Sequence, residues 1–206
     1  MAFLRTALAP ETWPIIRGGG LVLRAPQPAD YSQWAELRAV SREHLRPWEP
    51  EWARDELSRT AFRRRLRFYQ KDMREEAGYA FFIFEEKHHA LVGGLTLSNI
   101  RRGVTQATAL GYWTGLPYVG RGFMTRAVGL AADFVFSELQ LHRMEAACLR
   151  NNFGSIAVLE RNGFQREGVA RGYLKINGKW QDHVLFALLN DDRRGIKHRR
   201  EGQLQR

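Results

Sequence analysis

The chain has 206 residues, a net charge of +10 and 44% hydrophobic residues. This hydrophobic share is typical of a folded domain and excludes a disordered chain, and no stretch reaches the roughly 18 apolar residues that a membrane-spanning helix needs. The positive charge favours polyanionic partners such as nucleic acid, a ribosome or a phosphorylated cofactor, but is equally compatible with simple solubilisation. Since Cys148 is the single cysteine, no internal disulfide can form, and we expect a cytoplasmic protein without membrane contact.

Composition divides the chain into three parts. Residues 1–19 read as an irregular lead-in, which the glycine run Gly18–Gly20 closes. Residues 20–189 read as one domain, because no repeat or linker interrupts them. Residues 190–206 are polar and basic, so we expect a flexible tail.

The spacing of apolar residues within the domain indicates its elements in chain order. A short strand at residues 21–23 is stopped by prolines, and a helix is expected over residues 29–44, before a second Pro-rich interruption. This order predicts an α/β fold of the α+β kind, a mixed and mostly antiparallel sheet of about seven strands flanked by about four helices, with one strand–helix–strand crossover. The later elements are a helix over 55–76, strands over 79–84, 91–100 and 105–114, a helix over 123–139, a strand over 143–149, a helix over 155–161, and a hairpin of 169–176 and 180–189.

A basic face runs along the helix expected over residues 55–76. Its arginines at 63, 64, 65 and 67 have two interpretations. They form either a solvated helix face balanced by nearby acids, or a surface that contacts rRNA or ribosomal particles. The first is favoured, because exposed helices are commonly charged.

The segment Tyr118–Thr125 carries the strongest chemical signal. It joins a strand to the start of an amphipathic helix, where first-turn N–H groups lack partners and the helix dipole favours an anion. Gly120 and Gly122 allow a phosphate to approach the backbone closely. The segment is not a dinucleotide fingerprint, whose third glycine is replaced by Thr125, nor a Walker loop. A tight glycine turn without a ligand is the alternative.

A second segment, from Asn152 to Phe164, favours the phosphate-binding loop over the tight turn without a ligand. It starts a helix with an Asn-x-x-Ser pattern and ends in Gly-Phe. Together with Gly120-Arg121-Gly122, about thirty residues earlier, it resembles the two signatures of the GNAT superfamily of N-acetyltransferases. The usual Gln or Arg of the family's loop is Pro117 here, which is tolerable because backbone amides hold the pyrophosphate.

Three further segments narrow the resemblance. Residues 44–50, 97–103 and 173–183 are similar to the ribosomal-protein-alanine N-acetyltransferases of the RimJ/RimL type, and the similarity covers roughly residues 20–190. It implies a GNAT fold, acetyl-CoA as co-substrate, and the N-terminal amine of a ribosomal protein as acceptor.

The resemblance also implies where acetyl-CoA binds. The strand before the phosphate loop splays from its neighbour in this fold, the pantetheine arm lies in the gap, and the thioester carbonyl meets backbone donors there. Asn152 orients the pantetheine or a water, or is a simple turn residue. The expected cofactor-binding residues are Trp113, Thr114, Gly115, Leu116, Gly120, Arg121, Gly122, Phe123, Met124, Thr125, Asn152 and Ser155.

Direct attack of a free amine on the thioester needs few catalytic groups. Ser155 is expected to donate a proton to the leaving thiolate, or alternatively to cap its helix. Glu49 is our candidate base and, with Trp48, the candidate acceptor contact; its alternative is an ordinary exposed loop acid. Asp182 and His183 are alternative candidates for the base. A weak base suffices for an N-terminus, because an α-amine has a pKa of about 7.7–8.0 against about 10.4 for lysine.

Three functions stay open at this point. The first is N-terminal acetylation of a protein; the second is acetylation of a small amine such as a polyamine or an aminoglycoside, for which acids at 49, 51, 55 and 56 supply a modest cluster. The third is a ribosome-associated acetyl-CoA-binding module without catalysis. No metal is expected, because neither a His-Glu-x-x-His pattern nor paired cysteines occur.

Overall fold

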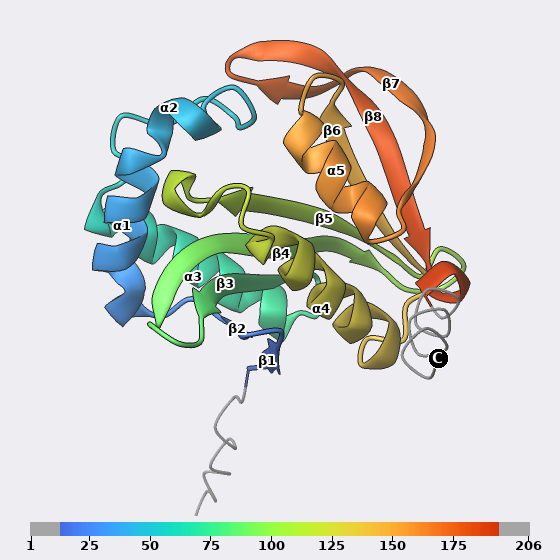
Figure 1. The fold of residues 1–206 in the computed structure, drawn as a ribbon, viewed down its shortest axis with the longest axis horizontal. Coiled ribbons are helices and arrows are strands. Elements are labelled where there is room, and N and C mark those ends of the chain that lie inside the picture. The colour runs from blue at the N-terminus through green and yellow to red at the C-terminus, as the bar shows by residue number, and fades with distance from the viewer. Residues whose placement is uncertain (1–12, 194–206) are drawn as a thin grey trace, which may run out of the picture.

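The computed structural model describes residues 13–193. In this part of the chain, eight strands form one sheet in the order β1-β2-β3-β4-β5-β6-β8-β7 (Figure 1). Neighbouring strands are antiparallel except β5 and β6, which are parallel and are joined through a helix. The strands are β1 (Ile15–Gly18), β2 (Leu21–Arg24), β3 (Tyr79–Glu85), β4 (Ala90–Arg101), β5 (Ala107–Thr114), β6 (Arg143–Leu149), β7 (Gln165–Ile176) and β8 (Lys179–Leu189).

Helices cover both faces of this sheet, as expected for an amphipathic sheet whose side chains alternate between faces. Helices α4 and α5 lie in front of the sheet in Figure 1, and α3 lies behind it. The labelled helices are α1 (Tyr31–Val40), α2 (Arg42–Leu45), α3 (Arg59–Arg74), α4 (Phe123–Ser137) and α5 (Phe153–Arg161), with 3-10 turns η1 (Pro28–Asp30) and η2 (Leu116–Tyr118). A further helical turn follows at residues 190–193.

The two faces carry separate cores. Leu95 and Leu97 of β4 pack with α4 and α5 in the larger core. Phe82 and Phe84 of β3 pack with Trp34, Phe62 and other side chains of α1 and α3 in the smaller one. The expected α+β architecture is confirmed, and the sheet has one strand more than the sequence indicated.

The parallel pair β5–β6 separates along its length. Pairing covers Ala107–Leu110 of β5 against Arg143–Ala146 of β6 and then stops. Residues 111–114 and 147–149 continue as strands without pairing to each other. The expected splay beside the phosphate loop is therefore present, and backbone groups on both strands face the gap.

The extra strand lies in the segment expected to be irregular. Residues Ile15–Gly18 form β1, which pairs with β2 across the two-residue turn of Gly19 and Gly20. Both glycines have positive φ, +56° and +73°, as a tight type I′ hairpin turn requires. The lead-in prediction is wrong for this stretch, while residues 1–12 lie outside the described part.

Three other boundaries differ from expectation. The helix expected over 29–44 breaks at Ser41, whose buried Oγ accepts a hydrogen bond from the Leu116 N–H at 2.8 Å. α3 begins at Arg59 because Ser58 caps it. Residues 190–193 are helical, and Arg193 is buried against Asp133 at 3.0 Å, so the predicted flexible tail is wrong there; residues 194–206 lie outside the described part.

Candidate active site

A cleft of about 420 Å³ opens where β5 and β6 separate. Its walls come from the end of α2, the loop before α4, the two strands and the start of α5. The cleft brings together most of the residues that the sequence assigned to the cofactor: Trp113, Thr114, Gly120, Gly122, Phe123, Met124, Thr125, Asn152 and Ser155, with Trp48 and Glu49 beside them.

The loop before α4 has the geometry of an anion site. Gly120 and Gly122 adopt φ of +75° and +72°, a left-handed conformation that side chains disfavour. Gly122 is the N-cap of α4 and supplies no side-chain acceptor. The first-turn N–H groups of α4 therefore stay available to an anion, and the helix dipole favours one there.

Two arginines add positive charge to this loop. The guanidinium of Arg121 lies 5.0 Å from the ring centre of Phe123, and that of Arg126 lies 4.9 Å from the same ring. Both side chains are exposed at the mouth of the cleft. Arg121 does not line the cleft itself, so we expect it to act on a bound phosphate through charge and not through burial.

Two expected cofactor contacts use their backbone donors elsewhere. The Gly115 N–H donates to the Val92 carbonyl at 2.9 Å, and the Leu116 N–H donates to Ser41. Neither residue lines the cleft. The N–H groups of Gly115 and Leu116 are thus already satisfied by β4 and Ser41, and contact of these two residues with acetyl-CoA stays a prediction.

Ser155 faces a tyrosine that sequence reasoning missed. The Tyr112 hydroxyl lies 2.8 Å from Ser155 Oγ, and burial raises the pKa of Tyr112 far above its usual range. Burial also raises the pKa of the nearby Cys148 thiol, although a hydrogen bond with Ser155 lowers it in part. The Tyr112 hydroxyl and the Cys148 thiol thus keep their protons at neutral pH, and both residues line the cleft.

Asn152, and not Ser155, caps helix α5. Its side-chain oxygen accepts a hydrogen bond from the Ser155 N–H at 3.1 Å. This cap leaves the Ser155 hydroxyl free of the capping role and fixes the residue in the first turn of the helix. The capping alternative for Ser155 is therefore wrong, and Asn152 orients Ser155 through the backbone.

Glu49 is held in a partly buried ion pair that the sequence did not reveal. Its two oxygens accept hydrogen bonds from Arg38 at 2.6 and 2.7 Å, and Trp52 Nε1 donates to it at 2.8 Å. The Arg38 guanidinium lies 4.3 Å from the Trp52 ring and 5.0 Å from the Trp113 ring. Glu49 is thus a fixed carboxylate and not the freely exposed loop acid of the alternative interpretation.

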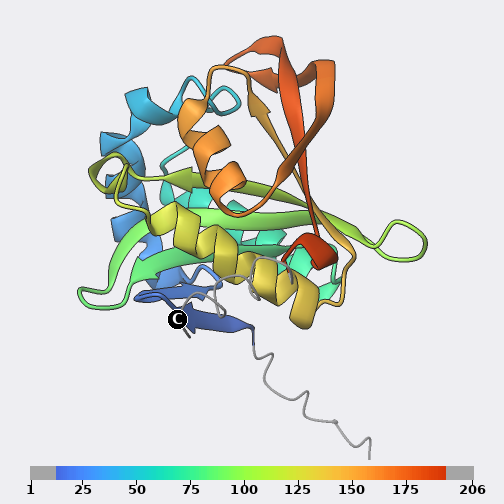
Figure 2. The same cartoon turned by 45° about the vertical axis from the view of Figure 1, so that its right-hand side comes forward.

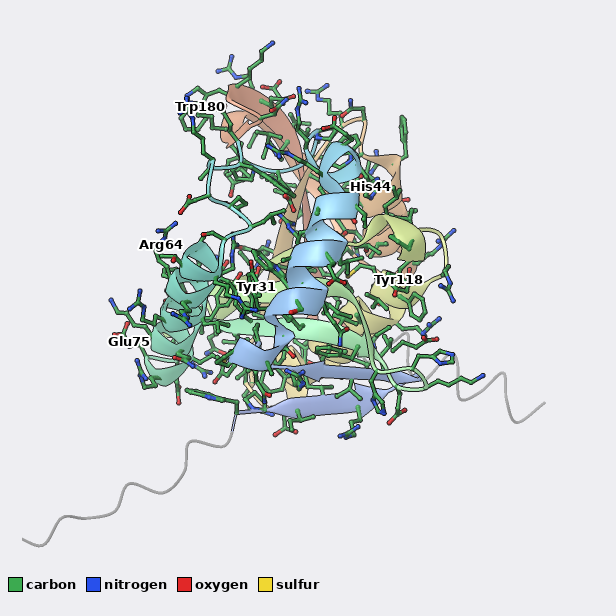
Figure 3. The ribbon with its side chains drawn as sticks, turned by 90° about the vertical axis from the view of Figure 1, so that its left-hand side faces the viewer. Tyr31, His44, Arg64, Glu75, Tyr118 and Trp180 are labelled. Atoms are coloured by element: carbon green, nitrogen blue, oxygen red, sulfur yellow. The ribbon has the colours of Figure 1, made fainter. Side chains whose placement is uncertain are left out.

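A second cleft reaches the same point from the other face of the sheet. It measures about 350 Å³ and is lined by α1, α3 and the loop after α2. It shares Glu49, Gly111, Tyr112 and Trp113 with the first cleft. Tyr118 on the loop side and Arg64 on the α3 side lie on opposite sides of α1 (Figure 3). The two clefts therefore adjoin each other at Tyr112.

The alternative candidates for the base, Asp182 and His183, have local partners. The Asp182 carboxylate accepts a hydrogen bond from the Gly172 N–H at 2.9 Å, away from the cleft. His183 lines the cleft but is buried, and its Nδ1 lies 2.9 Å from the Gln181 carbonyl oxygen. Within residues 13–193, His, Cys, Asp and Glu side chains form no group of three that could hold a metal. No helix in this part is long and apolar enough to span a membrane.

Fold and site together define the class of the protein. The family model described as acetyltransferase (GNAT) domain matches residues 20–165. The chain therefore belongs to the GNAT acetyltransferases, and it is an N-acetyltransferase.

The relatives act on ribosomal proteins or are named N-acetyltransferases. The chain is 35% identical to the probable N-acetyltransferase YjcK of Bacillus subtilis, over 86% of this chain and 98% of that protein. It is 32% identical to the [ribosomal protein uS5]-alanine N-acetyltransferase of Escherichia coli, over 84% and 89%.

Solved structures agree with these relatives. Mycobacterium smegmatis RimJ, solved in complex with CoA-disulfide, has a TM-score of 0.81 and 30% identity, covering 89% of each chain. The ribosomal-protein-S5-alanine acetyltransferase from Vibrio fischeri has a TM-score of 0.80 and 32% identity, covering 87% of this chain and 98% of that one. The resemblance to the RimJ/RimL type that the sequence indicated is confirmed.

Proposed function

We propose that the enzyme transfers the acetyl group of acetyl-CoA to the N-terminal α-amine of a protein, with alanine as the first residue and a ribosomal protein as the acceptor. The observation that carries this proposal is the meeting of two clefts at Tyr112, one from each face of the sheet. Such a layout suits a ternary complex in which amine and thioester react directly. The names of the relatives support the acceptor class.

Acetyl-CoA would enter through the cleft between β5 and β6. The amides at the start of α4 would hold the pyrophosphate, and the pantetheine would lie along the unpaired ends of β5 and β6. The open backbone groups of residues 111–114 and 147–149 suit such an extended arm, because they offer hydrogen bonds that the sheet leaves unused. Asn152 contributes by fixing α5 against this gap.

The amine would enter through the second cleft. Its nitrogen attacks the thioester carbonyl carbon, a C–N bond forms, and the C–S bond breaks with the electron pair leaving on sulfur. The Ser155 and Tyr112 hydroxyls then supply the proton that the thiolate takes. Glu49 Oε1 accepts one hydrogen bond from Arg38 and keeps a lone pair, so it can accept the proton lost by the amine, directly or through water. Trp48 lines the wall beside it.

A polyamine acceptor is less well supported. Three of the four acids near the second cleft are already paired with arginines: Glu49 with Arg38, Asp55 with Arg64, and Glu56 with Arg65. Glu51 forms no ion pair among residues 13–193. One uncompensated carboxylate suits a single ammonium group better than a polycation.

Contact with ribosomal RNA rests on less. Two of the arginines on α3, Arg64 and Arg65, are engaged by acids, while Arg63 and Arg67 are exposed. We keep RNA contact, and a cytoplasmic location, as parts of the proposal that the net charge of +10 supports.

An acceptor panel tests the proposal. The enzyme would be incubated with acetyl-CoA and, separately, an Ala-initiated peptide, the same peptide with a blocked N-terminus and one lysine, and spermidine, while release of the CoA thiol is followed. We expect turnover of the first far above the other two. Efficient turnover of spermidine with none of the peptide would support the small-amine function, and no turnover at all would support a binding module.

A further inference from the structure

A third cleft continues the second one away from the reaction centre. It measures about 500 Å³ and lies between α3 and the uncovered face of β4. The two clefts share Glu56, Arg65, Tyr69, Ala80 and Thr96. Since neighbouring clefts with common walls form one passage, a continuous groove runs from Tyr112 along the sheet to Ser98.

The floor of this groove is a strip of sheet formed by β4 and β5. On this face β4 and β5 present the small residues Gly94, Thr96, Ser98 and Gly111. Gly111 is exposed, Thr96 and Ser98 are partly exposed, and Gly94 is buried against the Trp113 side chain at the inner end of the groove. A Cβ added at Gly111 would lie 3.1 Å from Thr96 Oγ1. The absence of a side chain at Gly111 therefore leaves the space above the floor open.

The wall of the groove comes from α3, where both arginines are paired with acids and Asp72 adds one further carboxylate. Phe68 and Tyr69 offer aromatic surface, and 59% of Phe68 is exposed to solvent. Arg64 pairs with Asp55 at 3.6 Å, and Arg65 pairs with Glu56. A wall with paired charges and an exposed aromatic ring suits an uncharged polypeptide backbone better than a polyanion.

On the side of the β7–β8 hairpin, a hydrogen bond joins the wall of the second cleft to the hairpin. The Asn177 N–H, in the turn between β7 and β8, donates to the Glu49 carbonyl oxygen at 2.9 Å. The hairpin thus reaches over the gap toward the loop after α2 (Figure 1). An acceptor chain whose first residue lies at Tyr112 is therefore directed along β4.

We propose that this groove binds the residues that follow the first residue of the acceptor polypeptide, in extended conformation. The inference rests on the proposed N-terminal acetylation and deepens it. From Gly94 to Ser98 the strand rises about 13 Å, the length of about four extended residues. The enzyme then recognises an N-terminal segment of about five residues, and not the terminal residue alone.

Acceptors of increasing length test the inference. Alaninamide and Ala-initiated peptides of two, three, five and eight residues would be compared by kcat/KM at saturating acetyl-CoA. We expect kcat/KM to rise by about tenfold or more up to about five residues and then to level off. Equal values for alaninamide and the octapeptide would overturn the groove while leaving N-terminal acetylation intact, whereas no turnover of any of them would overturn the proposed function.

Two groove variants and two controls locate the effect. Phe68→Ala removes the exposed ring, and Thr96→Arg fills the floor; each should reduce the octapeptide-to-alaninamide ratio of kcat/KM by about threefold or more. Val104→Ala, at a fully exposed site in the β4–β5 loop visible in Figure 2, should leave the ratio unchanged. Trp180→Ala, on the β7–β8 hairpin, should do the same. A ratio that falls in Trp180→Ala but not in Phe68→Ala would show that the chain passes under the hairpin and would overturn the proposal.

Discussion

The hydroxyl oxygens of Tyr112 and Ser155 lie 2.8 Å apart, although 43 positions separate the two residues. Tyr112 comes from β5 and Ser155 from α5, so the bond spans the gap where β5 and β6 separate. Burial raises the pKa of Tyr112, which keeps its proton in place at neutral pH. In the proposed mechanism, this pair supplies the proton that the leaving thiolate takes.

Removing either hydroxyl should slow the chemical step. We expect Ser155→Ala and Tyr112→Phe each to lower kcat by about a hundredfold, with little change in acetyl-CoA affinity, because proton donation acts mainly in the transition state. The double variant should be hardly slower than either single one, since the two act as a unit. Steady-state kinetics and acetyl-CoA titration check this, with Tyr79→Phe as a control outside the site. An unchanged kcat in Ser155→Ala would remove it from catalysis.

Stability should fall in alkaline solution. The pKa of Tyr112 is raised in the folded state by burial, so above the ordinary tyrosine pKa of about 10 the unfolded chain loses a proton that the folded chain keeps. Below about pH 10 the free energy of unfolding is unaffected by this group. Above it, the free energy of unfolding falls by about 1 kcal/mol per pH unit. Urea unfolding at pH 9, 10 and 11 measures it, and Tyr112→Phe should flatten the slope. Identical slopes would contradict burial of the phenol.

The phosphate loop can be tested against a matched glycine. Gly122→Val places a branched side chain at φ +72°, where the phosphate would approach, and should abolish the rise in Tm that acetyl-CoA causes. Gly103→Val imposes the same backbone strain at φ +66°, in the β4–β5 loop. It should lower Tm and still respond to acetyl-CoA. A wild-type response in Gly122→Val would refute the loop assignment.

The Arg38–Glu49 pair separates a structural role from a chemical one. Glu49→Gln leaves the buried guanidinium without its counter-charge and should cost about 3 kcal/mol of stability. Arg38→Met with Glu49→Gln should recover much of that loss, because neither charge is then left alone. If Glu49 accepts the proton of the amine, kcat should stay low in the double variant. Recovery of both stability and kcat would make the pair purely structural.

Part of the site could be predicted from local patterns in the sequence. Gly120 and Gly122 were identifiable because a helix start and positive-φ glycines are encoded by neighbouring residues. Tyr112 was missed because its role depends on which face of β5 it occupies and on α5 packing against that face. Alternate residues of a strand point to the same face of the sheet. Since Leu110 is buried in the larger core, this alternation could have placed Tyr112 on the same face.

Other misses have the same non-local cause. Arg38 lies one helical turn after Trp34, on the buried side of α1, and a charged residue in that position is a signal for a buried partner. Its partner Glu49 is fixed only when the loop after α2 folds back. The strand β1 was missed because four residues carry little periodicity, although Gly19-Gly20 between apolar runs is a hairpin signal.

The most direct measurement is a competition within one molecule. An octapeptide with a free N-terminal alanine and one internal lysine would be incubated with enzyme and acetyl-CoA, and fragment-ion mass spectrometry would locate the acetyl group. We expect a single acetyl group on the α-amine, because in the proposed mechanism the second cleft admits a chain end to Tyr112 and an α-amine is far more often neutral than a lysine near pH 7. Acetylation of the lysine, or no acetylation while spermidine is turned over, would contradict it.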